Sequence, residues 1–139
     1  MAKGVLEGTP IPVGTNPLGV VITPDGKKLY TLNTATTSVI DTKTNTVIHT
    51  IDVGNLAGAF PAITPDGKYL YVPQLGTPTN SPGTVVVIST ATDTVVGTPI
   101  PVGVDPIFVA IAPNGKRAYV SNYGPSLTNA SVTVIAIDE

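Results

Sequence analysis

Few side chains in this chain have the type and spacing that chemistry requires. Asp25 and Asp66 occupy one position of a recurring Pro-Asp-Gly-Lys segment, and Asn114 replaces them in its third occurrence. Carboxylates could bind a divalent cation, but asparagine substitutes well in a tight turn and poorly for a charged ligand. We therefore predict that these three side chains shape turns and bind no metal.

The remaining candidates for catalysis lack partners. His49, the single histidine, has no second ligand or base near it in the sequence, and we expect it to face solvent on an outer strand. No serine lies in a Gly-x-Ser-x-Gly segment, and the absence of cysteine excludes disulfides, thiolate metal sites and a cysteine nucleophile. Glu7 and Glu139 lie at opposite ends of the chain and are predicted to be edge charges. The sequence therefore predicts no catalytic residue, no cofactor and no metal.

Composition narrows the class of protein. The chain has 139 residues, of which 42% are hydrophobic and 12% charged, so it can form one domain with a real core. The net charge of −2 and the lack of a basic cluster argue against nucleic acid as a partner. No apolar run approaches the roughly 20 residues that span a membrane, and no signal peptide is visible at the N-terminus. We expect either a cytoplasmic protein or a segment of a longer secreted chain.

Three internal repeats organise the chain. Residues 23–30 recur as residues 64–71 and 112–119, and a Val-Gly pair and an isoleucine-containing strand recur in the same order around them. The period of about 40–50 residues is typical of propeller blades and other modular folds. Asp-Gly and Asn-Gly between apolar runs are strong signals for hairpins, because glycine accepts the positive φ of tight turns. The sequence therefore predicts three similar antiparallel units.

Each unit is predicted to contain up to four strands. The first strands are expected at 18–23, 61–64 and 107–112, the second at 28–33, 68–73 and 116–122, the third at 38–41, 84–89 and 131–138, and the fourth at 46–53 and 94–102. Four antiparallel strands in a repeat of this length describe a β-propeller blade. We predict a single domain over residues 1–139, with blades at about 14–53, 54–102 and 103–139 and an additional N-terminal strand at 4–13.

The N-terminal strand matches what the third repeat lacks. The third repeat has no fourth strand, whereas residues 8–14 (Gly-Thr-Pro-Ile-Pro-Val-Gly) are identical to residues 97–103 of the second repeat. Open sheet edges favour closure, and two-fold dimers are the commonest oligomers. We predict an all-β propeller with three four-stranded blades per chain, closing as a six-bladed homodimer in which residues 4–11 complete the partner's last blade. The alternative is a segment excised from a parent with seven or eight blades.

The repeats resemble the YVTN family of β-propellers, which occur in surface-layer and cell-surface proteins of archaea and bacteria. The family signature appears here as Tyr119-Val120-Ser121-Asn122, with Tyr71-Val72-Pro73-Gln74 and Tyr30-Thr31-Leu32-Asn33 at corresponding positions. The resemblance covers nearly the whole chain. It implies a propeller scaffold without shared catalytic residues and a location outside the cell, although this chain shows no signal peptide.

One face of the predicted propeller gathers the longest loops. Loops that enter the first strand of a blade and loops that leave the second strand share this face, and function concentrates on loops of rigid scaffolds. Two long polar insertions lie there, at 74–83 and 123–130. We predict a non-enzymatic scaffold that binds protein, peptide or glycan through this face. The candidate ligand-binding side chains are Asn16, Asn33, Asn55, Gln74, Asp105, Asn122 and Tyr123.

The sequence leaves two alternative functions open. Propellers that resemble this family include lactonases and redox enzymes with sites at the mouth of the central channel, where Asp105, Asn16 and Asn55 would be the candidates. A designed or excised repeat fragment without a selected ligand is the other alternative. The repeated tyrosines are predicted to pack between blades instead of forming a ligand site; they are Tyr30, Tyr71 and Tyr119.

Overall fold

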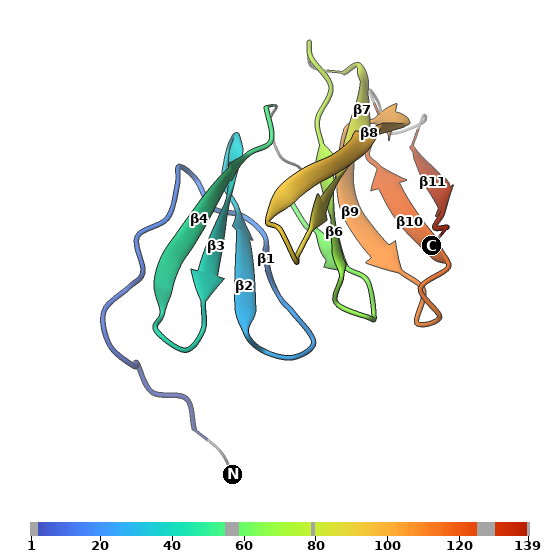
Figure 1. Cartoon of the computed structure of the whole chain (residues 1–139). Helices are drawn as coiled ribbons and strands as arrows, with labels where there is room; N and C mark the ends of the chain where they lie inside the picture. Colours follow the sequence, from blue (N-terminus) through green and yellow to red (C-terminus); the bar gives the residue numbers. More distant parts are fainter. Residues whose placement is uncertain (1–2, 55–58, 79, 125–129, 139) are drawn as a thin grey trace.

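The fold consists of β-sheets throughout the part of the chain that the computed structural model describes, which is residues 3–54, 59–78, 80–124 and 130–138. Three antiparallel sheets stand side by side, and the chain passes through them in order (Figure 1). Within these described residues no helix is long and apolar enough to cross a membrane. The all-β, partial propeller architecture predicted from the repeats is confirmed.

Each sheet is a meander in which consecutive strands pair. The first sheet contains β1 (Val20–Ile22), β2 (Lys28–Leu32), β3 (Thr36–Asp41) and β4 (Thr46–Asp52). The second contains β5 (Ala62–Ile63), β6 (Tyr69–Gln74), β7 (Pro82–Ser89) and β8 (Thr94–Val104). The third contains β9 (Pro106–Ile111), β10 (Arg117–Asn122) and β11 (Ser131–Ala136). All of the predicted strands except the N-terminal one form within the single chain, with ends that differ from the expected ones by a few residues.

The N-terminal segment is the exception. The third sheet has three strands, and residues 3–13 lie outside every strand of their own chain. Val5 and Leu6 are 87% and 86% exposed, and the segment extends away from the first sheet (Figure 1). The third sheet therefore has a free edge at β11 among the described residues.

The repeated turns form as the sequence predicts. The Asp25 carboxylate accepts hydrogen bonds from the Thr23 hydroxyl at 2.6 Å and from the Lys27 backbone N–H at 3.0 Å. Gly26 supplies the positive φ of 73° that the turn requires. In the third repeat the Asn114 side chain accepts the corresponding backbone N–H, from residue 116, at 3.0 Å. The bond from the Thr23 hydroxyl, followed by the backbone bond, lowers the pKa of Asp25.

The core lies between the sheets, in two layers. The layer between the first and second sheets is built from Tyr30, Leu32, Val39, Ile51, Val53, Leu70, Val72, Val86 and Ile88. The layer between the second and third sheets is built from Tyr71, Val85, Val109, Ala118, Val120 and Ile135. Each sheet of this fold therefore needs a neighbour on its apolar faces, because that contact is where its hydrophobic area leaves water.

Candidate functional site

The predicted loop-rich face exists at one end of the three sheets. The backbone N–H of Thr34, after β2, donates to the carbonyl of Thr15, before β1, at 2.9 Å. In the third sheet the backbone N–H of Tyr123, after β10, donates to the carbonyl of Asp105, before β9, at 2.9 Å. These bonds hold the entering and leaving loops together, at the end of the sheets opposite the Pro-Asp-Gly turns (Figure 1).

Three of the predicted site residues are buried in this end of the sheets. Asn33, Gln74 and Asn122 are each 2% exposed. The Asn33 Nδ2 atom donates to the Ser38 hydroxyl at 2.9 Å, and the Asn122 Nδ2 atom donates in the same way to Thr133 at 2.9 Å. The Gln74 Nε2 atom donates to the backbone carbonyl that follows β4, at 2.8 Å. These side-chain amides link neighbouring strands and sheets, and they are buried from solvent.

The geometry shared by Asn33 and Asn122 explains the glycines Gly14 and Gly103. A Cβ atom added at Gly14 would lie 2.6 Å from the Asn33 Nδ2 atom, and one added at Gly103 would lie 2.7 Å from the Asn122 side chain. The recurring Pro-Val-Gly segment therefore ends in glycine so that its backbone can pack directly on the buried amide. Among the described residues neither Asn33 nor Asn122 has a hydrogen-bond partner for its Oδ1 atom.

The other predicted residues lie at the surface or outside the described residues. Asn16 and Asp105 both have a φ of 50°, a left-handed conformation that asparagine and aspartate tolerate better than most residues. Asn16 is exposed and Asp105 is half-buried. Tyr123 is 63% exposed. Asn55 falls in the range 55–58, which lies outside the described residues.

An aromatic pair near Asp105 was not identified from the sequence. The rings of Phe60 and Phe108 stack with centroids 4.2 Å apart and planes 7° from parallel. Both are unusually open for phenylalanine, at 43% and 51% exposed. Phe108 follows Asp105 on β9, and Tyr123 is joined to Asp105 by the backbone bond above. Phe60 and Phe108 meet through the contact between two sheets, and the sequence signal for this is that the chain's two phenylalanines occupy the same position of consecutive repeats.

A buried polar network connects the first and second sheets at the opposite end. The Asp93 carboxylate, 3% exposed, accepts hydrogen bonds from the Tyr30 hydroxyl at 2.6 Å and from the Lys28 Nζ atom at 2.8 Å. The His49 Nε2 atom lies 3.8 Å from the same carboxylate, although the imidazole is 57% exposed. His49 thus faces solvent, as expected, but has an acidic neighbour from another sheet. Burial, followed by the hydrogen bond to Asp93, strongly raises the pKa of the Tyr30 hydroxyl.

The raised pKa predicts a loss of stability at alkaline pH. Below the ordinary tyrosine pKa of 10.0 the Tyr30 hydroxyl is protonated in both the folded and the unfolded chain. Above that pH the unfolded chain releases the proton first, so the free energy of unfolding falls as pH rises. Tyr30→Phe should reduce the slope of this fall, measured by urea unfolding from pH 9 to about 11. Tyr123→Phe, at an exposed site, serves as the control; an unchanged slope in Tyr30→Phe would contradict the assignment.

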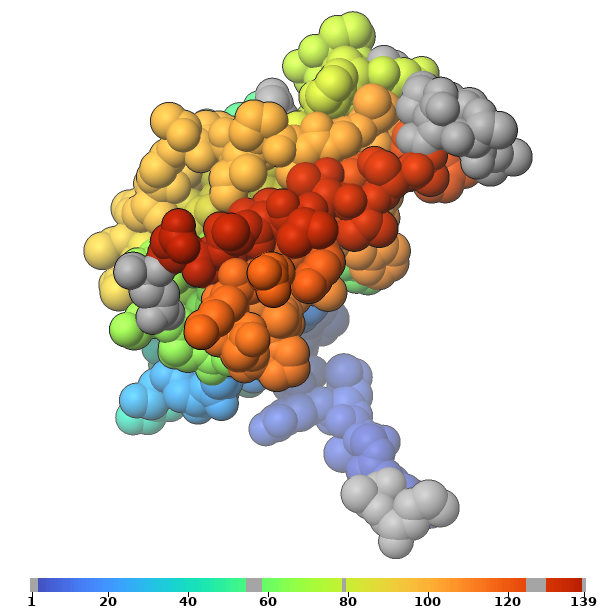
Figure 2. Space-filling view, turned by 90° about the vertical axis from the view of Figure 1, so that its right-hand side faces the viewer, coloured from blue at the N-terminus to red at the C-terminus, as the bar shows by residue number. Residues whose placement is uncertain are grey.

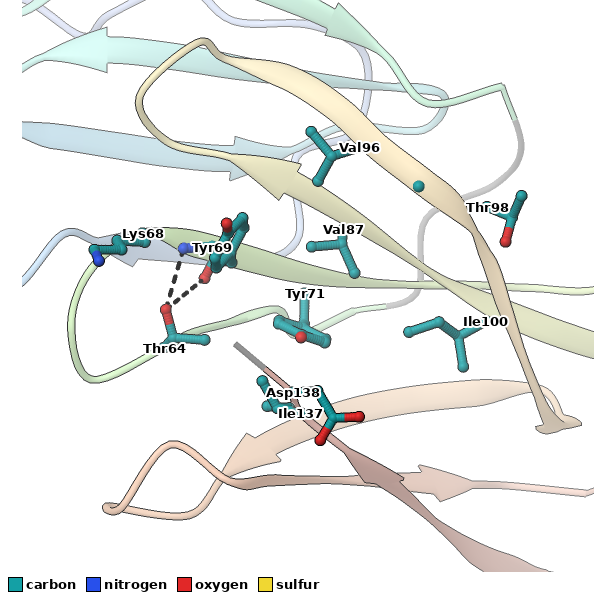
Figure 3. A pocket seen from close by; sticks show the side chains of 11 residues that line it. Thr64, Lys68, Tyr69, Tyr71, Val87, Val96, Thr98, Ile100, Ile137 and Asp138 are labelled. Carbon is teal, nitrogen blue, oxygen red and sulfur yellow. Dashed lines mark hydrogen bonds between the residues drawn. The ribbon is translucent and has the colours of Figure 1, made fainter.

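A cavity of about 420 Å³ opens between the second and third sheets (Figure 3). Tyr69, Tyr71 and Val87 form its floor, and Ile137 and Asp138, which follow β11, form one wall. Burial raises the pKa of the Tyr71 hydroxyl. The polar groups in its lining are the Asp138 carboxylate, the Lys68 ammonium and the hydroxyls of Thr64, Thr98, Tyr69 and Tyr71.

The described residues contain no group of three or more His, Cys, Asp or Glu side chains that could hold a metal ion. Asp25 and Asp66, the carboxylates considered from the sequence, lie in the corresponding turns of the first and second sheets and line one pocket together with Lys27 and Lys28. Each of them accepts a hydrogen bond from the threonine hydroxyl two residues earlier, at 2.6 Å. Their turn-shaping role is confirmed.

Comparison with known proteins establishes the fold. Neither a protein-family model nor a curated protein matches the sequence. Among solved structures, the hydrazine synthase of Kuenenia stuttgartiensis is 32% identical over 86% of this chain, with a TM-score of 0.78. The eukaryotic initiation factor and the mitotic checkpoint complex each contain a chain that is 15% identical, with TM-scores of 0.66 and 0.69 over 88% and 87% of this chain. This chain spans 34%, 30% and 36% of those three chains, so each comparison matches about a third of a larger protein. The similarity is to β-propellers, and it identifies the three sheets as propeller blades.

Proposed function

We propose that this protein is a non-enzymatic β-propeller scaffold that binds an extended protein segment, peptide or glycan through its loop-rich face. The observation that carries the proposal is the stacked and exposed pair Phe60 and Phe108, together with the exposed Tyr123, whose backbone N–H donates to the Asp105 carbonyl. Aromatic rings give large contact areas at low entropy cost, and they are enriched where binding energy concentrates. A neighbouring carboxylate can accept hydrogen bonds from hydroxyl or amide groups.

The arrangement suits a polymer better than a small substrate. The rings lie on the surface of the sheets, so they offer a platform and not an enclosed pocket. The buried amides at the loop-rich end of the sheets, Asn33, Gln74 and Asn122, would act as rigid support for the loops and not as contact residues. Display at a cell surface, as the resemblance to the YVTN family implies, belongs to the same proposal.

Binding to arrays of oligosaccharides and of extended peptides tests this function. We expect a ligand on one of the two arrays, and the array that responds decides between glycan and peptide. Tyr123→Ala should weaken binding by tenfold or more, which corresponds to about 1.4 kcal/mol. Lys43→Ala, in the exposed turn after β3 at the opposite end, is the matched control and should bind normally. Absence of binding on both arrays, or an equal loss in both variants, would refute the proposal.

A further inference from the structure

One position of the repeat carries a tyrosine in all three sheets, and this tyrosine is buried in the first two sheets and exposed in the third. Tyr30 and Tyr71 occupy this position in the first and second sheets, and each faces the following sheet, with 0% and 6% of the side chain exposed. Tyr119 occupies it in the third sheet and is 41% exposed. Val132 and Val134 on β11, on the same face as Tyr119, are 60% and 55% exposed. The outward face of the third sheet is thus built like the two faces that pack on a following sheet.

The face of the first sheet that points away from the second sheet also carries exposed apolar side chains. Val20 and Ile22 on β1 are 61% and 52% exposed. Val109, at the position of Val20 in the third sheet, is 7% exposed because it packs against the second sheet. The first sheet therefore presents the kind of face that packs on a preceding sheet. The two open faces are the two halves of a junction that already occurs twice within the chain.

The second observation concerns the free edge of β11. Figure 2 shows β11, the edge strand of the third sheet, running beside β8, while the N-terminal segment points away from it. Residues 8–14 repeat residues 97–103 identically, and residues 97–103 lie in β8, the fourth strand of the second sheet. An unpaired strand edge readily accepts a strand of suitable sequence. Residues 4–11 have such a sequence and no strand partner in their own chain.

The third observation is the cavity between the second and third sheets. At the junction of the first and second sheets, the turn between β7 and β8 places Asp93 against Tyr30 and Lys28. The residues at the positions of Tyr30 and Lys28 in the second sheet are Tyr71 and Tyr69, and both line the cavity. The cavity therefore occupies the place where the start of a fourth strand, added beside β11, would lie.

We propose that a second copy of this chain packs its first sheet on the outward face of the third sheet and supplies residues 4–11 as the fourth strand beside β11. Two copies related by a two-fold axis then form a ring of six blades with no free sheet edge of this kind. This inference goes beyond the proposed function. Phe108 lies on the outward face of the third sheet, because it pairs with Ser121 and Ser121 pairs with Val132, whereas Tyr123, whose replacement tests the proposed function, lies in the loop after β10.

The pairing in the second sheet sets the register of the added strand. In that sheet Ile88 lies opposite Val95 and Val85 lies opposite Ile100. By repeat position, Ile88 corresponds to Ile135 and Val95 to Leu6, so Ile135 of one copy should lie opposite Leu6 of the other. In the same way, Val132 of one copy should lie opposite Ile11 of the other. Leu6 would then point toward the cavity side of the third sheet, on the face that carries Ile135.

A cysteine pair tests this register in a chain that has no cysteine of its own. The variant Leu6→Cys with Ile135→Cys should oxidise to a covalent dimer, seen on a non-reducing gel, because paired strands bring Cα atoms within disulfide range. In the variant Leu6→Cys with Val132→Cys, the second cysteine lies three residues earlier on β11, out of register with residue 6, so this variant should give little covalent dimer. A cross-link within single chains, or equal yields in both variants, would overturn the proposal.

The solution mass and one surface variant test the packing of the two open faces. The unmodified chain should have twice its 14.2 kDa mass by light scattering. Val134→Glu places a charge in the proposed interface at a side chain that the single chain leaves 55% exposed, so it should fold and yet be monomeric. Ile48→Glu, on the outer strand β4 and 42% exposed, should remain dimeric. A monomeric unmodified chain, or a folded and dimeric Val134→Glu variant, would overturn the proposal.

Discussion

Replacing Asp93 by alanine is expected to lower the free energy of unfolding by about 3–4 kcal/mol. The change leaves the buried Tyr30 hydroxyl and the Lys28 ammonium without their shared acceptor, and Lys28 is itself only 28% exposed. It also places alanine at a φ of 54°, which costs about 1 kcal/mol. Urea unfolding at neutral pH measures the effect.

The chain supplies a matched control for the backbone part of this effect. Asn45 occupies the corresponding turn of the first sheet at a φ of 55°, and its side chain is exposed. Asn45→Ala should cost only about 1 kcal/mol, so the difference between the two variants isolates the network around Asp93. Equal losses in Asp93→Ala and Asn45→Ala would show that the buried hydrogen bonds contribute nothing net.

The second large effect is expected at Leu70. Leu70 is 0% exposed in the apolar layer between the first and second sheets. Leu70→Ala removes buried methyl groups and leaves a cavity, so we expect a loss of about 3–4 kcal/mol in the free energy of unfolding. Urea unfolding at low protein concentration is the measurement, because dilution keeps self-association from contributing to stability.

The residues that correspond to Leu70 in the first and third sheets show how the cost depends on the neighbouring sheet. Leu29, at the same position in the first sheet, is only half-buried and lies on the open face, so Leu29→Ala should cost about 1 kcal/mol in the single chain. The third sheet carries Ala118 there, also fully buried, which shows that a smaller side chain can be accommodated where the neighbouring sheet supplies the volume. A cost for Leu70→Ala no larger than that for Leu29→Ala would contradict the packing described here.

The proposed binding and assembly surfaces meet at Phe108 and are separate at Tyr123. Phe108 pairs with Ser121 and Ser121 pairs with Val132, so Phe108 shares the outward face of the third sheet, whereas Tyr123 lies in the loop after β10. A variant such as Val134→Glu can therefore report on assembly while leaving Tyr123 in place. Loss of ligand binding in that monomeric variant would show that the binding surface needs sheets from two copies.

The strands and their turns could be predicted from the sequence because they depend on local interactions. A proline, an aspartate or asparagine, and a glycine in succession restrict φ within a few residues, and the three turn glycines accordingly have φ values of 73°, 76° and 73°. Short β-branched runs between such turns leave few alternatives to antiparallel strands. The match between residues 8–14 and residues 97–103 is likewise a property of the sequence alone.

Only the tertiary structure decided which of the repeated polar residues face solvent. Asn33, Gln74 and Asn122 looked like surface residues at the ends of strands, but their partners lie on neighbouring strands or on another sheet. The bond between Tyr30 and Asp93 and the stacking of Phe60 on Phe108 likewise join residues far apart in the chain. Such contacts arise when sheets pack face to face, and because a strand has two faces, only its neighbours determine which side chains are buried.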